Sequence, residues 1–178
     1  MSLNFNPQVM RGALAVLGSA LFLVIAPGIV VILVPWWISR WIVQESVLRI
    51  PFIRALGVLL ILGGLPVLLG SFAGFALQGL GTPAPVFPTR HLVMKGFYRY
   101  VRNPMYLAVV LLIFGQALML GNGVLFGYGV LVWLACHVFV LAYEEPTLRT
   151  TFGAEYDAFC ANVPRWRPRT SPWRPNRE

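Results

Sequence analysis

The chain has 178 residues, of which 58% are hydrophobic and 11% charged, and its mean hydropathy is +0.73. A soluble domain averages about 25% charged residues. Residues 12–39, 55–89 and 103–143 contain no Asp, Glu, Lys or Arg, and each stretch exceeds the roughly 20 apolar residues that a membrane-crossing helix requires. The composition excludes a soluble globular protein and predicts one all-α integral membrane domain.

The charge balance favours a membrane surface as a partner. Lys and Arg number 14 against 6 Asp and Glu, a net charge of +8, and an excess of this kind is typical of loops that face anionic lipid. We expect no nucleic-acid partner, because the arginines lie beside the apolar stretches. The cysteines, Cys136 and Cys160, are too few for a disulfide scaffold and are predicted to be reduced. No usual metal-ligand spacing occurs, so no metal site is expected.

The first apolar run predicts a retained membrane anchor, because it is longer than the roughly 7–15 apolar residues of a cleaved signal peptide. We expect a helix from about Gly12 to Ile38, with a kink at Pro27. Trp36, Trp37 and Trp41 near its end are typical of a membrane interface.

A second helix is predicted from about Phe52 to Leu77, because Pro51 suits a first helical turn. Pro66 should bend this helix. The glycines around residues 57–64 predict close packing of helices rather than phosphate binding. Three prolines and two glycines within residues 79–88 predict a loop.

The charge-free run 103–143 has 41 residues. It would measure about 60 Å as one helix, twice the apolar thickness of a bilayer, so it must fold back. Gly121-Asn122-Gly123 predicts the turn, between helices near Met105–Leu120 and Val124–Tyr143. The prediction is therefore about four transmembrane helices, or fewer if one hairpin is re-entrant. Residues 1–78 hold the first two spans, residues 79–168 the loop, hairpin and tail helix, and residues 169–178 a basic tail.

From Glu145 the tail predicts a cytosolic amphipathic C-terminal helix, because apolar residues recur at three- and four-residue steps. These residues are Leu148, Phe152, Tyr156, Phe159 and Val163. After Pro164, arginines alternate with Trp166 and Pro168 as far as Arg169, which predicts an interfacial anchor on anionic lipid.

The distribution of basic residues predicts the orientation. With four spans, both termini, the 78–104 loop and the tail share one side with eleven basic residues, and the other side has three. The eleven are Arg11, Arg90, Lys95, Arg99, Arg102, Arg149, Arg165, Arg167, Arg169, Arg174 and Arg177; the three are Arg40, Arg49 and Arg54. The positive-inside rule places the eleven, and so both termini, in the cytoplasm.

The hairpin predicts a cluster of charges at its cytosolic end. Folding about Asn122 places Arg102 level with Glu144 and Glu145. Charges near the apolar zone are costly and tend to be paired or functional. Two interpretations stay open: an ion pair with Arg102 or Arg149 that caps a span, or a functional site. His137, within the last span, is expected to be a hydrogen-bonded packing residue.

Two stretches resemble a known family. Residues 92–106, LVMKGFYRYVRNPMY, resemble the LV-x-x-G-P-Y-x-x-x-R-H-P-x-Y signature of the integral membrane methyltransferases that include the isoprenylcysteine carboxyl methyltransferases and the phospholipid N-methyltransferases. The EE-x-x-L, FG-x-x-Y and V-P elements that close this family are similar to Glu144 to Leu148, Phe152 to Tyr156 and Val163 to Arg165. The resemblance covers roughly residues 80–168.

The resemblance implies a helical enzyme that binds S-adenosylmethionine at the cytosolic ends of its last two spans and methylates a lipophilic or membrane-embedded acceptor. The residues implied at the cofactor site are Gly96, Tyr98, Asn103, Pro104, Tyr106, Leu107 and Glu144. Arg102 and Glu145 are implied as catalytic. Methyl transfer depends mainly on alignment of the reactants, which agrees with the lack of a nucleophile–base arrangement in the sequence.

The chain departs from the family pattern at three positions. Asn103 stands where the family usually has His, which removes a protonatable imidazole, while Phe97 replaces Pro and Ala108 replaces a frequent Gly. A carboxylate, an amine, a thiol and an isoprenoid remain open as acceptors. Two other functions also remain open: a non-catalytic membrane adaptor that binds anionic lipid through the tail, and a reductase on a related helical scaffold.

Overall fold

The computed structural model describes residues 7–45, 52–74 and 92–174, apart from the side chains of residues 7–15 and Ser19. Every regular element in these ranges is a helix, which confirms the predicted all-α class. Three helical segments are long and apolar enough to cross a membrane, Val16–Ser39, Ile53–Gly74 and Gly123–Phe152. A fourth apolar helix, α4 (Pro104–Leu120), has 17 residues and is about 26 Å long.

The first span consists of α1 (Pro7–Pro27), the π-helical turn η1 (Gly28–Leu33) and α2 (Val34–Ser39). The change to π-helix follows Pro27 directly. Side chains of the later helices bind the carbonyls of η1: Gln116 Nε2 lies 2.9 Å from Val31 O, and the Tyr128 hydroxyl lies 3.0 Å from Val30 O. These bonds attach the first span to the rest of the bundle.

The helix α3 (Ile53–Gly74) packs closely against α4 because glycines face the contact. A Cβ built on Gly57 would lie 2.6 Å from the carbonyl oxygen of Gly115, and one on Gly64 would lie 3.3 Å from that of Ala108. The prediction that glycines in this stretch serve helix packing is confirmed for Gly57 and Gly64. The predicted start near Phe52 is confirmed to within one residue, because α3 begins at Ile53. The predicted end near Leu77 lies outside the described residues.

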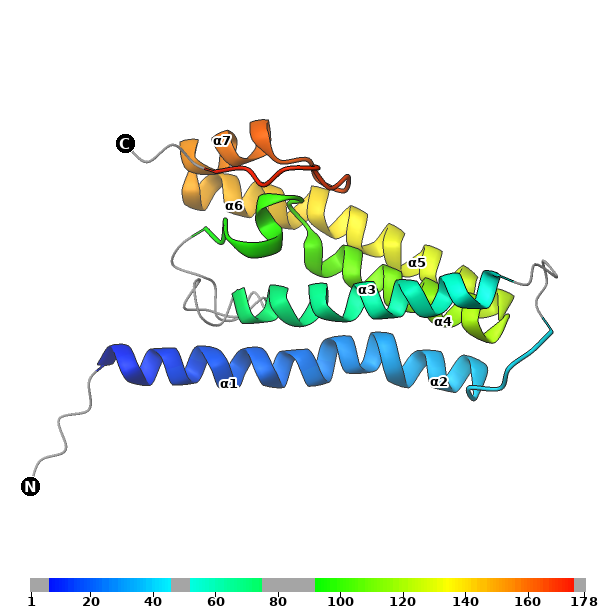
Figure 1. Cartoon of the computed structure of the whole chain (residues 1–178). Helices are drawn as coiled ribbons and strands as arrows, with labels where there is room; N and C mark the ends of the chain where they lie inside the picture. The colour runs from blue at the N-terminus through cyan, green and yellow to red at the C-terminus, as the bar shows by residue number, and fades with distance from the viewer. Residues whose placement is uncertain (1–6, 46–51, 75–91, 175–178) are drawn as a thin grey trace, which may run out of the picture.

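The predicted turn between the last two spans is confirmed. Gly121 ends α4 with a φ of +68°, and the side chain of Asn122 accepts a 2.9 Å hydrogen bond from the backbone N–H of Leu125 at the start of α5 (Gly123–Phe139). The helix continues through the π-turn η4 (Val140–Glu144) into α6 (Glu145–Phe152). In Figure 1 the starts of α1 and α4 lie at the same end of the bundle as α6.

The tail begins with a helix at Glu145, as predicted, but it is not one helix over the whole apolar stripe. It breaks at Gly153, whose φ is +51°, and resumes as α7 (Ala154–Asn162). A residue with positive φ does not continue a right-handed helix. The predicted apolar positions nevertheless share one face: Tyr156, Phe159 and Val163 are buried together with Val93 and Tyr98.

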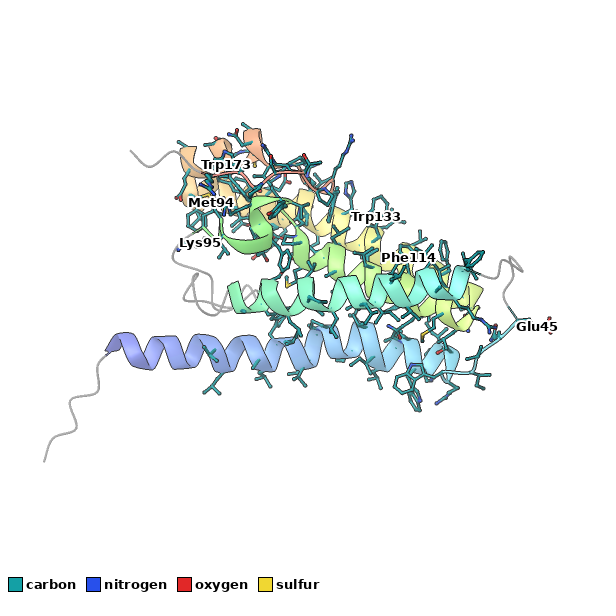
Figure 2. All side chains as sticks on the ribbon, viewed as in Figure 1. Glu45, Met94, Lys95, Phe114, Trp133 and Trp173 are labelled. Carbon is teal, nitrogen blue, oxygen red and sulfur yellow. The ribbon has the colours of Figure 1, made fainter. Side chains whose placement is uncertain are left out.

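This cluster closes the end of the bundle at which α6 begins. It joins the tail to the segment before α4, which contains the short 3₁₀-helix η3 (Gly96–Arg99). Met94 and Trp173, labelled at this end of the molecule in Figure 2, pack against the same cluster from the two segments.

Candidate active site

The two segments that carry the family resemblance meet at a hydrogen bond between Tyr106 and Glu144. The Tyr106 hydroxyl, on the first turn of α4, donates to Glu144 Oε2 over 2.9 Å. The ring of Phe139 lies edge-on to Tyr106 at 6.5 Å between centroids. Among the described contacts only one oxygen of Glu144 is engaged, so Oε1 remains able to accept from a ligand.

Tyr98 of η3 belongs to the same electrostatic neighbourhood. Its side chain is buried. Burial raises the pKa of the Tyr98 phenol well above its ordinary value, the charge of Glu144 raises it further, and a hydrogen bond with Ser71 of α3 opposes both. Tyr98 therefore remains a neutral phenol close to the Glu144 carboxylate.

The neighbouring acid, Glu145, is held between two arginines. Arg102 Nη1 lies 3.1 Å from Glu145 Oε1, while Arg165 donates from Nε to Oε1 over 2.5 Å and from Nη2 to Oε2 over 2.9 Å. The side chains of Arg102 and Glu145 are each only 11% exposed. Arg149, the other partner considered from sequence, pairs with Asp157 instead, in an exposed ion pair of 2.8 Å.

Arg102 has further contacts with the tail. Its backbone N–H donates to Pro164 O over 2.9 Å, and its Nη1 also lies 2.8 Å from Cys160 Sγ. Among the described residues, the buried Nε of Arg102 and the buried Nη2 of Arg99 have no hydrogen-bond partner. Unpaired buried donors are rare in proteins and fit a site for an anionic group.

Asn103 and its neighbours form the start of α4. Asn103 precedes the helix, and its buried side chain donates from Nδ2 to Arg165 O over 3.2 Å, so it holds the tail. Pro104 is fully buried in the first turn. Leu107 is half-buried, and its N–H closes that turn on Asn103 O at 3.1 Å.

Gly96 and Phe97 lie at the edge of the site. Gly96 is exposed and has a φ of +58°, so it serves the turn before η3, and no described contact joins it to Glu144. The ring of Phe97 rests on Gly70 of α3, where an added Cβ would lie 2.7 Å from Phe97 Cε2. Gly70 thus accommodates the departure from proline.

The Arg/Trp segment after α7 makes internal contacts that sequence analysis missed. Arg165 binds Glu145, and Trp166 Nε1 donates to Nδ1 of His137 over 3.0 Å. The prediction that His137 is a hydrogen-bonded packing residue is confirmed. Arg165 and Trp166 therefore have partners inside the protein, while Arg167 is exposed. The anchor on anionic lipid stays a prediction.

The signal for Arg165 was available in the sequence. Arg165 closes the family-like stretch Val163-Pro164-Arg165, although its alternation with Trp166 favours a contact with lipid. Within the described part of the chain, no group of three or more His, Cys, Asp or Glu side chains has a metal-binding arrangement.

Comparison with protein families gives a match over more than half of the chain. Residues 52–155 match the family model described as Phospholipid methyltransferase. The matched range contains α3, the 92–106 segment, the hairpin and the acidic pair. No curated protein and no solved structure matches the chain.

Proposed function

The chain belongs to the phospholipid methyltransferase family, and we propose that it transfers a methyl group from S-adenosylmethionine to a lipophilic acceptor, at the end of the hairpin formed by α4 and α5. Membrane methyltransferase activity follows from the family. The donor, the position of the site and the acceptor are the proposal. The observation that carries it is the Tyr106–Glu144 hydrogen bond, because it joins both signature segments at one point.

The groups at this end of the hairpin fit the donor. S-adenosylmethionine carries an ammonium, a carboxylate, ribose hydroxyls and a sulfonium. Oε1 of Glu144 suits the ammonium or the hydroxyls, and the unpaired Arg102 Nε and Arg99 Nη2 suit the carboxylate, because hydrogen bonds between charged groups are the stronger ones. The rings of Tyr98 and Tyr106 suit the sulfonium, since aromatic faces attract cations.

The residues of the site act by positioning. When bound, S-adenosylmethionine supplies an electrophilic methyl group. Tyr106 orients the Glu144 carboxylate, and the paired arginines fix Glu145 at the start of α6. The buried cluster of Tyr156 and Phe159 excludes water from this end of the bundle. Alignment of the reactants and exclusion of water supply much of the rate of a direct displacement.

A lipid acceptor agrees with the family and with the short α4. A helix of 17 residues is shorter than the roughly 30 Å apolar layer. Its active end therefore lies below the interface, where a lipid-borne acceptor enters sideways. A phospholipid amine is the first candidate, and the likeness of residues 92–106 to the isoprenylcysteine carboxyl methyltransferases keeps a carboxylate acceptor as the alternative.

The direct test is binding of S-adenosyl[methyl-³H]methionine to the purified protein in detergent. We expect saturable binding to the wild type and affinity about tenfold lower or worse for Glu144→Gln, because a charge-assisted hydrogen bond is lost. Glu155→Gln changes an exposed acid of α7 and should bind like the wild type. A wild-type protein that is folded by circular dichroism and does not bind the donor contradicts the proposal.

A further inference from the structure

Residues 164–166 join the tail to the two helices that carry the site. At the start of α4, Pro164 O accepts the N–H of Arg102 over 2.9 Å, and Arg165 O accepts Nδ2 of Asn103 over 3.2 Å. These bonds involve the backbone of the tail. They fix its path beside α4 but leave the direction of the Arg165 side chain open.

On α5 the tail is held by an aromatic contact with a defined hydrogen bond. Trp166 Nε1 donates to His137 Nδ1 over 3.0 Å, and the two rings lie 5.8 Å apart between centroids. His137 stacks on Trp133, labelled in Figure 2, at 5.4 Å and 16°. The stack holds the imidazole in one orientation, so its Nδ1 is a fixed acceptor for the indole.

This contact anchors Trp166, and the residue before it, Arg165, binds Glu145. His137 and Glu145 belong to the same continuous helix, so Trp166 and Arg165 contact this helix at two points. From these contacts we infer that the Trp166–His137 pair is a positioning device. It sets the guanidinium of Arg165 in its two-bond contact with Glu145 and thereby holds the acidic pair in place for the donor.

Arg165 needs such an anchor more than Arg102 does. Its side chain is 31% exposed, compared with 11% for Arg102, and a long exposed side chain loses much rotamer freedom when it is fixed. When Trp166 is anchored, less of the chain has to be ordered to fix the Arg165 side chain. The backbone bonds to Arg102 and Asn103 remain when the indole bond is removed, so its loss is expected to loosen Arg165 without unfolding the tail.

This inference rests on the proposed function for its effect on donor binding, and not for the contact itself. Two readouts therefore test it. The first is hydrogen exchange of the Arg165 Nε–H, followed by ¹⁵N NMR of the protein in nanodiscs without donor. The second is the Kd of S-adenosylmethionine from calorimetry.

Three variants change the hydrogen bond in defined ways. His137→Leu removes the acceptor, and Trp166→Phe removes the donor but keeps a ring. His137→Asn keeps an acceptor, because Asn Oδ1 and His Nδ1 are both bonded to Cγ. Trp37→Phe is the control, since Trp37 is 67% exposed on α2 and far in sequence from the site.

We expect His137→Leu and Trp166→Phe to accelerate exchange of the Arg165 Nε–H and to raise the donor Kd about fivefold, the worth of one hydrogen bond. The double variant should match either single one, because both remove the same bond, and His137→Asn should restore both readouts. Unchanged exchange in both single variants overturns the inference, as does a failure of His137→Asn to rescue. If the wild type binds no donor, the proposed function fails, and the exchange measurement still decides the positioning role.

Discussion

At the scale of single residues, a buried carboxylate between two arginines contributes to the free energy of unfolding. Glu145 is the common partner of Arg102 and Arg165, and removing one member of a buried pair leaves an uncompensated charge. We expect Glu145→Gln to lower the free energy of unfolding by about 3–5 kcal/mol, measured by denaturant or SDS titration in mixed micelles.

The exposed pair Arg149–Asp157 is the matched comparison. Its side chains are 56% and 57% exposed, and exposed ion pairs contribute little because water screens them. Asp157→Asn should therefore leave the unfolding midpoint close to that of the wild type. Equal losses in the two variants would contradict the account of a buried, indispensable Glu145.

The sequence predicts the contact that depends on the hairpin, but not the contact that depends on the path of the tail. The meeting of Arg102 with Glu145 follows from a hairpin about Asn122, because residues about twenty positions before and after a turn lie at a similar height. The contact of Arg165 with Glu145 depends on how the tail folds back after α7. That path is set by backbone bonds to Arg102 and Asn103, which no periodicity encodes.

At the scale of elements, the α3–α4 contact depends on backbone proximity at glycine. We expect Gly57→Ala to destabilise the protein by about 1–3 kcal/mol, because its Cβ would meet the backbone of Gly115 at 2.6 Å and packed helices resist added volume. Gly63→Ala is the control on the same helix, since nothing lies within 4 Å of its added Cβ.

The expected order of thermal midpoints in detergent is therefore Gly63→Ala equal to or above the wild type, and Gly57→Ala well below it. Alanine is the better helix former, so only the steric contact separates the two variants. A similar midpoint for both would mean that α3 and α4 are not packed at this distance.

Element boundaries were predictable where one residue type dictates the backbone. Gly121-Asn122-Gly123 supplied a turn signal and the structure turns there. The break at Gly153 was missed because the apolar residues keep their helical spacing across it. Their common face survives the break, since Tyr156 and Phe159 pack against the segment before α4.

At the scale of the whole molecule, the up-and-down path of the helices brings the start of α4 to the same end as α6 and α7 (Figure 1). We expect this end to be cytoplasmic under the positive-inside rule. A fluorescent protein fused after residue 178 should be fluorescent in cells, and alkaline phosphatase fused at residue 45 should be active. The reverse pattern would place the acidic pair on the wrong side for a cytosolic donor.

The central claim is that the donor binds where the α4 start meets the Glu144–Glu145 pair. The most direct measurement is photo-crosslinking of an azido derivative of S-adenosylmethionine to the protein in nanodiscs, with the labelled peptides identified by mass spectrometry. The account predicts labels within residues 96–107 and 137–148 that excess S-adenosylmethionine removes. Competed labels confined to the first span, or to the α4–α5 turn at the opposite end, would contradict it.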